Sequence, residues 1–315
     1  MTTTNKKFYF ISGLPRSGST LLSSILNQNP RFSASISDSL ISFTKSYINI
    51  ANSDGGVKSM ISEEKLKDLI IDMFHSYYKN DNEICFNTNR IWTSEIPLIK
   101  SLFPDFKMIV CMRHIPWILD SFEVLERKDP YTLKPLYGNM NLSNVYQRSH
   151  MLMGNIPDTG GGVVSDPLLN LKHLVHSEDR HSVLYLDYDA LVQHPKEVMK
   201  IVYNYLEEDY FEHDFNSVGA KYEKYDEGVK IKDLHTVRDS VGFNKRKTIL
   251  PTDLWNMYAE YSFWKTNPEI MADLKYVYTE DAPEVESKQE IAYESSEPVS
   301  SSNVAGFIPK YYKGD

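Results

Sequence analysis

The 315-residue chain has few cysteines, no long apolar run and no excess of basic residues. Its two cysteines, Cys85 and Cys111, lie in apolar stretches, which predicts buried free thiols and a reducing, cytoplasmic location. The first apolar run follows a polar segment and is interrupted by Gly13 and Arg16, so we expect neither a signal peptide nor a membrane span. A formal net charge of −9 argues against bulk nucleic-acid binding.

Histidines and cysteines do not cluster at the spacing of a metal site, so we expect no metal. Instead, apolar strand-like runs alternate with amphipathic helix-like runs. This alternation predicts an α/β class, a P-loop-like three-layer fold with a central parallel sheet and helices on both faces. We expect strands near residues 7–12, 83–86, 107–113 and 182–188, and helices near 18–27, 62–80, 94–103, 142–154, 166–178 and 190–207, with another beginning near 114. Residues 1–278 form the expected domain, and residues 279–315, rich in Glu, Ser and Pro, form a polar, weakly ordered C-terminal tail.

The most informative segment, residues 8–22, is typical of a strand, a tight loop and a helix. The strand ends at Gly13, where a residue without a side chain lets the backbone turn freely. The free amide groups at the start of a helix, together with its positive dipole end, attract an anion. An ordinary Ser-rich helix start is the alternative interpretation. The expected anion-binding residues are Arg16, Ser17, Gly18, Ser19 and Thr20.

The spacing from Gly13 to Gly18 is that of a P-loop, but Ser19 stands where an NTP-hydrolysing loop has Lys. The segment resembles the sulfotransferases, which carry Pro-(Arg/Lys)-Ser-Gly-(Ser/Thr)-Thr after their first strand. In that family the loop holds the 5′-phosphosulfate of 3′-phosphoadenosine 5′-phosphosulfate (PAPS). The Arg form is more common in bacterial and Golgi-type members. The resemblance therefore implies a bacterial-type, PAPS-dependent enzyme in which Arg16 is catalytic.

A second segment strengthens this resemblance. The strand near residues 107–113 ends in Arg113, and Ser121 follows eight residues later on the next helix. Open parallel sheets bind ligands at the carboxyl ends of their strands. Taken alone, an Arg in this position is more often a surface ion pair. Sulfotransferases have this Arg and this Ser on the 3′-phosphate of the donor, the group that distinguishes it from ATP.

Weaker similarities to two other sulfotransferase motifs indicate further cofactor-binding residues. The late strand resembles the family's Leu-x-x-x-Tyr-(Glu/Asp)-x-Leu, which places Tyr188 near the adenine; a core or cap aromatic is the alternative. Family members close a basic C-terminal loop over the 3′-phosphate, and Arg238 and Arg246 are the candidates here. The segment lacks the Arg-Lys-Gly triplet of the cytosolic members, so a solvated basic loop is an equal alternative.

The general base is the least defined part of the prediction. Protein-tyrosine sulfotransferases place a Glu after the first helix, where this chain has Asp38; a helix N-cap is the alternative. Cytosolic members use a His in Lys-Thr-His, where this chain has Asn87–Trp92 without a His, and Arg90 replaces the Lys as a clamp on the sulfuryl group. Other candidate bases are His75, His114 and His235.

The expected acceptor is a hydroxyl or amine, and the sequence does not show whether it belongs to a small molecule, a sugar or a peptide. Aromatic residues expected to line its site are Phe43, Tyr47, Tyr131 and Tyr137. The sequence does not predict an oligomeric state. A P-loop small-molecule kinase and a non-catalytic nucleotide-binding protein of the same fold are the alternative functions.

Overall fold

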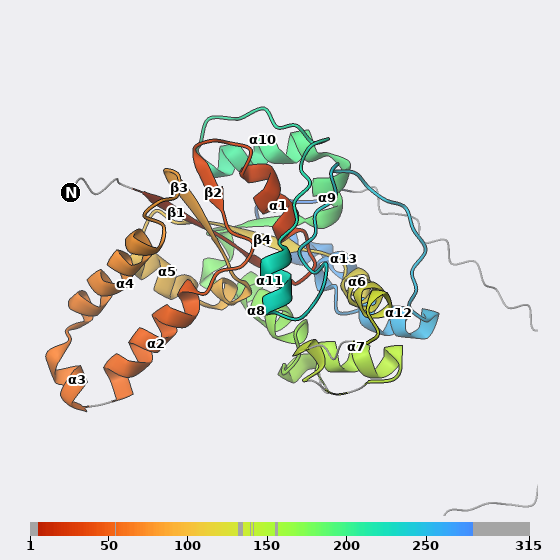
Figure 1. Ribbon diagram of the computed structural model, residues 1–315, viewed down its shortest axis with the longest axis horizontal. Coiled ribbons are helices and arrows are strands. Elements are labelled where there is room, and N and C mark those ends of the chain that lie inside the picture. The colour runs from red at the N-terminus through yellow and green to blue at the C-terminus, as the bar shows by residue number, and fades with distance from the viewer. Residues whose placement is uncertain are drawn as a thin grey trace, which may run out of the picture. The chain divides into compact units, whose positions relative to one another are not determined.

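The computed structural model describes residues 6–53, 55–131, 135–138, 140, 142–154 and 157–279. Within them a parallel sheet of order β2-β3-β1-β4-β5-β6 is formed (Figure 1). Its strands are β1 Lys7–Gly13, β2 Phe32–Ala34, β3 Ile84–Thr88, β4 Lys107–Met112, β5 Leu184–Asp187 and β6 Tyr276–Val277. The expected tail lies outside the described residues, apart from its first residue.

The helices that follow each strand cover both faces of the sheet. They are α1 Ser19–Leu26, α2 Leu40–Ser53, α3 Gly55–Met60, α4 Glu63–Tyr77, α5 Ile96–Leu102, α6 Ile115–Lys128, α7 Val145–Met153, α8 Ser165–His176, α9 Tyr188–Gln193, α10 Pro195–Leu206, α11 Glu223–Gly228, α12 Thr252–Ala259 and α13 Phe263–Thr266. A 3-10 helix, η1, spans Arg90–Ser94.

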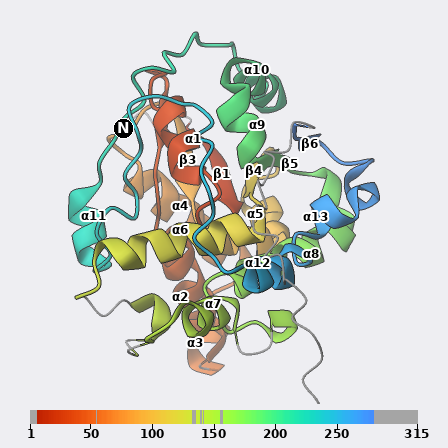
Figure 2. The same cartoon turned by 90° about the vertical axis from the view of Figure 1, so that its right-hand side faces the viewer.

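Side chains of β1 alternate between two hydrophobic cores. Phe8 and Phe10 pack with α2, α4, α5, α6 and α8 on one face of the sheet. Tyr9 and Ile11 pack with α1, α9 and α10 on the other face. Figures 1 and 2 show α9 and α10 on one side of the strands and α8 and α12 on the opposite side. Because apolar residues fill both faces, the predicted three-layer α/β fold is confirmed.

The strand order places a switch point beside β1. From β1 the chain adds β3 and β2 on one side, then β4, β5 and β6 on the other. In such sheets the connections diverge at the carboxyl ends of the central strands and leave a crevice there. Gly13, the last residue of β1, has φ 111°, and a Cβ on it would lie 2.1 Å from the carbonyl oxygen of Cys111 in β4. Only glycine therefore allows the two strands to approach so closely at this edge.

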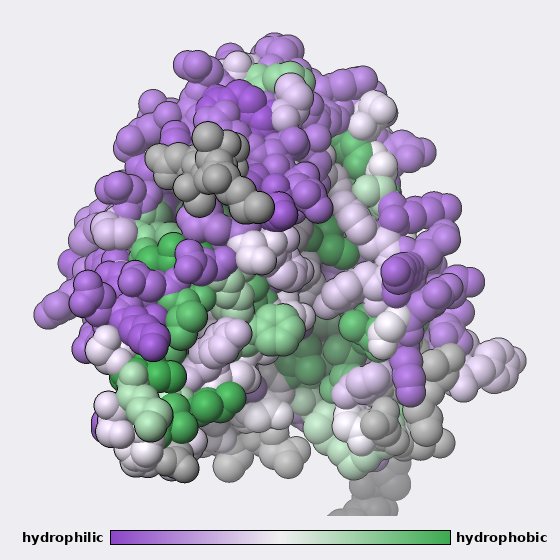
Figure 3. Space-filling view, turned by 60° about the vertical axis from the view of Figure 1, so that its left-hand side comes forward, coloured by the Kyte–Doolittle hydropathy of each residue, from purple (hydrophilic) through white to green (hydrophobic). Residues whose placement is uncertain are grey.

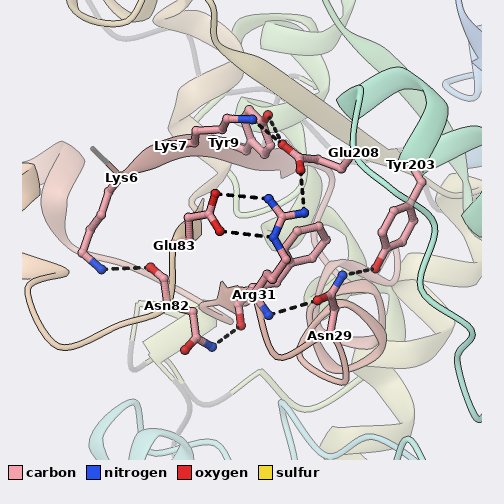
Figure 4. A network of polar contacts seen from close by, with 10 residues as sticks. Lys6, Lys7, Tyr9, Asn29, Arg31, Asn82, Glu83, Tyr203 and Glu208 are labelled. Atoms are coloured by element: carbon pink, nitrogen blue, oxygen red, sulfur yellow. Dashed lines mark hydrogen bonds and ion pairs between the residues drawn. The ribbon is translucent and has the colours of Figure 1, made fainter. Parts of the chain in front are cut away.

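At the amino ends of the strands, a charged network surrounds Glu208 (Figure 4). The buried Glu208 carboxylate accepts from Lys7 Nζ at 2.7 Å and Tyr9 Oη at 3.1 Å, and Arg31 lies 3.1 Å away. Arg31 also pairs with Glu83 at 3.2 Å. Burial and the Glu208 charge raise the pKa of Tyr9. The network joins the beginnings of β1, β2 and β3 to the end of α10, far from the crevice.

One helix that was predicted as continuous is interrupted in the structure. The expected helix at 190–207 is divided into α9 and α10 at His194, which has φ −130° and ψ 54°. Pro195 follows, and proline both lacks an N–H group and excludes helical geometry from the preceding residue. The predicted buried free thiols are confirmed, since Cys85 and Cys111 are both unpaired and buried. None of the described helices is long and apolar enough to cross a membrane.

Candidate functional site

The loop between β1 and α1 follows the carboxyl end of β1, at the switch point of the sheet. The Leu14 amide donates to the carbonyl of Cys111 at 2.9 Å, which fixes the start of the loop against β4. The Ser17 hydroxyl donates to the Leu14 carbonyl at 2.5 Å, so this side chain closes the loop on itself. Gly18, with φ 94°, precedes α1 and provides no capping side chain. The amides in the first turn of α1, at Ser19 and Thr20, therefore have no acceptor within the helix.

Tyr188, the first residue of α9, packs directly on this loop. A Cβ at Gly18 would lie 2.7 Å from Tyr188 Cδ2, so only glycine leaves room for the ring. The guanidinium carbon of Arg113 stands 4.2 Å from the centre of the same ring, a cation–π contact. The structure thus brings Gly18, Tyr188 and Arg113, three residues expected to bind the cofactor, into one cluster.

Arg16 and Arg113 are joined through the backbone of the loop. Arg113 follows β4, and its Nη1 donates to the Arg16 carbonyl at 3.0 Å. Arg16 itself has φ 57°, a conformation that costs energy for a residue with a side chain. Its Nε donates to Ser121 Oγ at 3.0 Å and its Nη1 donates to the Leu234 carbonyl. Arg16, Arg113 and Ser121, which are distant in sequence, therefore meet at the carboxyl ends of β1 and β4.

Carboxylates lie near these two arginines, with Asp226 acting on Arg16 and Asp189 and Asp120 acting on Arg113, but none of them forms a direct ion pair with either guanidinium in the described residues. Arg113 Nε is buried without a hydrogen-bond partner in the described part of the chain. Burial and the Arg113 charge lower the pKa of Arg16 to about 10, and burial lowers the pKa of Arg113. Buried cations with open donors are costly unless an anion joins them. An anionic group at this cluster would supply the partner that Arg113 Nε lacks among the described residues.

Arg246 reaches the same region but brings its own counter-charge. It forms an ion pair with Asp120, a fully buried residue of α6, and its guanidinium carbon stands 5.0 Å from the Trp117 ring centre. Asp120 Oδ1 also accepts from Thr248 Oγ1 at 2.8 Å and from the Ile249 amide at 2.9 Å. The basic segment is thus fastened to α6 beside Ser121. Sequence reasoning overlooked Asp120, although an acidic residue on the apolar face of a helix is a signal of a buried partner.

Two further predicted arginines differ in their surroundings. Arg238 is exposed and forms no hydrogen bond or ion pair with any other described residue. Arg90 begins η1, where Ser12 Oγ donates to its carbonyl at 3.2 Å, so its backbone lies beside the end of β1. Part of the Arg90 side chain is exposed. Nearby protein atoms still partly desolvate the guanidinium, and this desolvation lowers its pKa. Its side chain, too, has no hydrogen-bond or ion-pair partner in the described part of the chain.

Asp38 is buried and bonded on both carboxylate oxygens. Oδ1 accepts from the Leu40 amide at 2.9 Å, at the start of α2, and Oδ2 accepts from Tyr78 Oη at 2.7 Å. Tyr78 in turn accepts from Asn87 Nδ2 at 2.9 Å. The burial and the nearby Asp38 charge raise the pKa of Tyr78, so its hydroxyl stays protonated. This geometry is that of a cap that fixes α2 to α4 and β3.

The other candidate bases are widely separated. His75 packs edge-on against Phe8, with ring centres 5.0 Å apart, at the amino end of β1 and away from the crevice. His114 precedes α6, with its ring centre 5.5 Å from that of Trp255. Burial, with Lys265 and Arg113 nearby, lowers the pKa of His114 to about 4.

His235 lies beside the phosphate loop. It follows Leu234, whose carbonyl binds Arg16, and its Nδ1 lies 2.7 Å from Asp226 Oδ1. Sequence reasoning missed Asp226, because nothing in the spacing of the two residues indicates that an irregular segment folds them together.

The aromatic residues expected around the acceptor divide into two groups. Tyr137 is buried in the core at 3% exposure, so its predicted place in an open site is wrong. Phe43 and Tyr47 are 52% and 45% exposed on α2, together with Ile50. Figure 3 shows apolar side chains gathered in the lower part of this face, where the surface is hollowed, and hydrophilic side chains above.

The loop, the switch point and the six-stranded parallel sheet define a P-loop-like α/β protein. Residues 9–212 match the model of the sulfotransferase family. The chain belongs to the sulfotransferase family, and it is therefore a transferase that moves sulfuryl groups. The expected family membership is confirmed. In the described residues, no three His, Cys, Asp or Glu side chains gather as a metal site.

Solved structures of bacterial sulfotransferases are similar to this chain. The sulfotransferase from Alicyclobacillus acidocaldarius is 12% identical, with 71% of this chain and 92% of that chain covered and a TM-score of 0.46. The sulfotransferase domain of the Synechococcus PCC 7002 olefin synthase is 18% identical, with 81% and 94% covered and a TM-score of 0.43. Sulfotransferase STF9 from Mycobacterium avium is 14% identical, with 87% and 79% covered and a TM-score of 0.42. A search among curated proteins finds no match.

Proposed function

We propose that the protein transfers a sulfuryl group from PAPS to a hydroxyl or amine of a small-molecule, sugar or peptide acceptor. The observation that carries this proposal is the pair of arginines at the phosphate loop that form no direct ion pair with a described carboxylate. Arg113 Nε is buried with no partner, and Arg16 and Arg113 have no carboxylate partner in the described chain. The open first turn of α1 suits the 5′-phosphosulfate, and Arg113 with Ser121 suits the 3′-phosphate.

The chemistry that these residues support is mainly electrostatic. As the acceptor attacks sulfur, the bond from sulfur to the 5′-phosphate oxygen breaks and negative charge grows on that phosphate. By analogy with phosphoryl transfer, a fixed cation and backbone amides at the leaving group lower the barrier. Arg16 and the amides of Ser19 and Thr20 serve the leaving group in this proposal, and Arg90 holds the sulfuryl oxygens. Tyr188, Arg238 and Arg246 are the proposed contacts to the nucleoside and the 3′-phosphate.

The donor is tested by the affinity for 3′,5′-adenosine diphosphate, the product nucleotide. We expect it to bind more tightly than 5′-AMP by about 1.5–3 kcal/mol, on the order of tenfold to a hundredfold, because a charge-assisted pair forms with the additional phosphate. Calorimetry with both nucleotides and with ATP measures the difference. Equal affinities for the first two nucleotides, or a preference for ATP, would contradict the proposal and favour a kinase.

The role of Asp38 is tested by Asp38→Asn. The amide still accepts from the Leu40 amide but no longer accepts from Tyr78, so we expect unfolding to become easier by about 1–3 kcal/mol. We expect PAPS turnover to stay within about threefold of wild type, because an N-cap needs no basic oxygen. Thermal melting and initial rates measure the two effects. A loss of about a hundredfold in rate would instead make Asp38 the base.

A further inference from the structure

A histidine and an aspartate form a dyad in the segment that follows α11. His235 Nδ1 lies 2.7 Å from Asp226 Oδ1, and the His235 amide donates to Asp226 Oδ2 at 3.0 Å. The Asp226 side chain is only 5% exposed and that of His235 is 16% exposed. Two bonds to one buried carboxylate fix both the backbone and the ring of His235.

The hydrogen bonds also determine which ring nitrogen is free. An ionised carboxylate only accepts, so the proton of the neutral imidazole lies on Nδ1 and the lone pair lies on Nε2. In the described chain, Nε2 of His235 has no hydrogen-bond partner. The Tyr225 ring packs against the imidazole at nearly a right angle, with ring centres 4.9 Å apart, and restricts its rotation. The ring is therefore held by Asp226 and Tyr225, with Nε2 available.

The dyad lies against the phosphate loop. Arg16 Nη1 donates to the carbonyl of Leu234, the residue before His235. The charged groups that face His235 are Asp226 from α11, Arg16 from the loop and Arg90 from η1. Burial lowers the pKa of His235, Asp226 opposes this effect, and the two arginines add to it. The imidazole is therefore neutral at neutral pH and able to accept a proton.

We propose that His235 is the general base of the reaction and that Asp226 is its positioning residue. The inference rests on the proposed sulfuryl transfer. The lone pair of the acceptor oxygen or nitrogen forms the bond to sulfur. His235 Nε2 takes the proton that this acceptor atom loses. The bond from sulfur to the 5′-phosphate oxygen breaks, and its electron pair stays on that oxygen. The products are the sulfated acceptor and 3′,5′-adenosine diphosphate, and the imidazolium then releases its proton to water.

Nitrogen NMR of ¹⁵N-histidine-labelled protein tests the protonation state without any substrate. His235 is assigned by the signals that disappear in His235→Asn. We expect the Nδ1–H form, with a pKa below the ordinary value of about 6.5. In Asp226→Asn we expect both tautomers, because the amide no longer selects one. An Nε2–H form in the wild-type protein, or a charged ring at pH 7.5, would overturn the proposal.

Hydrolysis of PAPS tests the base without an identified acceptor, because water then supplies the proton. His235→Asn keeps a side-chain donor for Asp226 but no basic nitrogen, and we expect sulfate release to fall by about a hundredfold. Affinity for 3′,5′-adenosine diphosphate should change less than twofold. His181→Asn, a surface histidine paired with Asp273, is the matched control and should keep the wild-type rate. The wild-type rate should fall as the pH drops through the lowered pKa of the His235 ring and the ring becomes protonated.

The two proposals fail in different ways. If 3′,5′-adenosine diphosphate binds and PAPS is consumed equally well by His235→Asn, the base assignment is wrong and the proposed function stands. If wild-type protein neither binds this nucleotide nor consumes PAPS, the proposed function is wrong, and the base assignment falls with it.

Discussion

Arg16→Ala is expected to lower PAPS turnover by about two to three orders of magnitude, with little change in nucleotide affinity. In the proposed function, negative charge develops on the leaving phosphate beside the loop of Arg16, so the contribution of Arg16 would be largest in the transition state. Its guanidinium is already desolvated, which lowers its pKa to about 10 and strengthens its interaction with an incoming anion. Initial rates at saturating PAPS, together with calorimetry, separate the two quantities.

The control for this variant is Arg180→Ala. Arg180 pairs with Asp273 near the amino end of β5, so this change removes a surface arginine without altering the crevice. We expect wild-type rates for it. Because Arg16 also binds Ser121 and Leu234, a melting curve for Arg16→Ala shows whether the loop stays folded. Turnover within threefold of wild type in a folded Arg16→Ala protein would contradict the assigned role.

Arg113→Ala is expected to weaken binding of 3′,5′-adenosine diphosphate by about tenfold to a hundredfold, which corresponds to the loss of a charge-assisted pair of about 1.5–3 kcal/mol. Affinity for 5′-AMP should change little, so the preference for the 3′-phosphate should disappear. Turnover at saturating donor should fall less than in Arg16→Ala. Calorimetry with both nucleotides measures the change.

An opposite pattern would show that the two arginines have exchanged roles. In that case Arg113→Ala would lower only turnover, and Arg16→Ala would lower only affinity. Arg113 also donates to the Arg16 carbonyl, so Arg113→Lys is a useful second variant. It retains a positive charge but cannot reproduce the planar donor fork, and we expect an intermediate affinity.

The sequence predicts best what is local along the chain. The loop after β1 and the strand before Arg113 are visible because apolar runs end directly at glycine or arginine, and the structure places both at one edge of the sheet. The two shortest strands, β2 and β6, were not predicted, since three and two residues are too few to show a period. The division of the helix near His194 was indicated by Pro195 and overlooked.

The partners of the site residues are harder to predict, because tertiary contacts select them. Asp38 fits both a cap and a base in the sequence, and only the bonds to Leu40 and Tyr78 show how its oxygens are occupied. Asp226 and His235 are brought together by an irregular segment, and the hydrophobic pattern of the sequence does not predict how such a segment folds.

The bond from Arg16 to the carbonyl of Leu234 spans 218 positions of the chain. The region that matches the family ends at residue 212, before Leu234, His235 and Arg246. A protein cut at that boundary would retain the phosphate loop but leave the Asp120 carboxylate buried without its cation. The proposed anion site therefore needs residues that lie beyond the family region, and during synthesis it can form only after the chain has been made past residue 246.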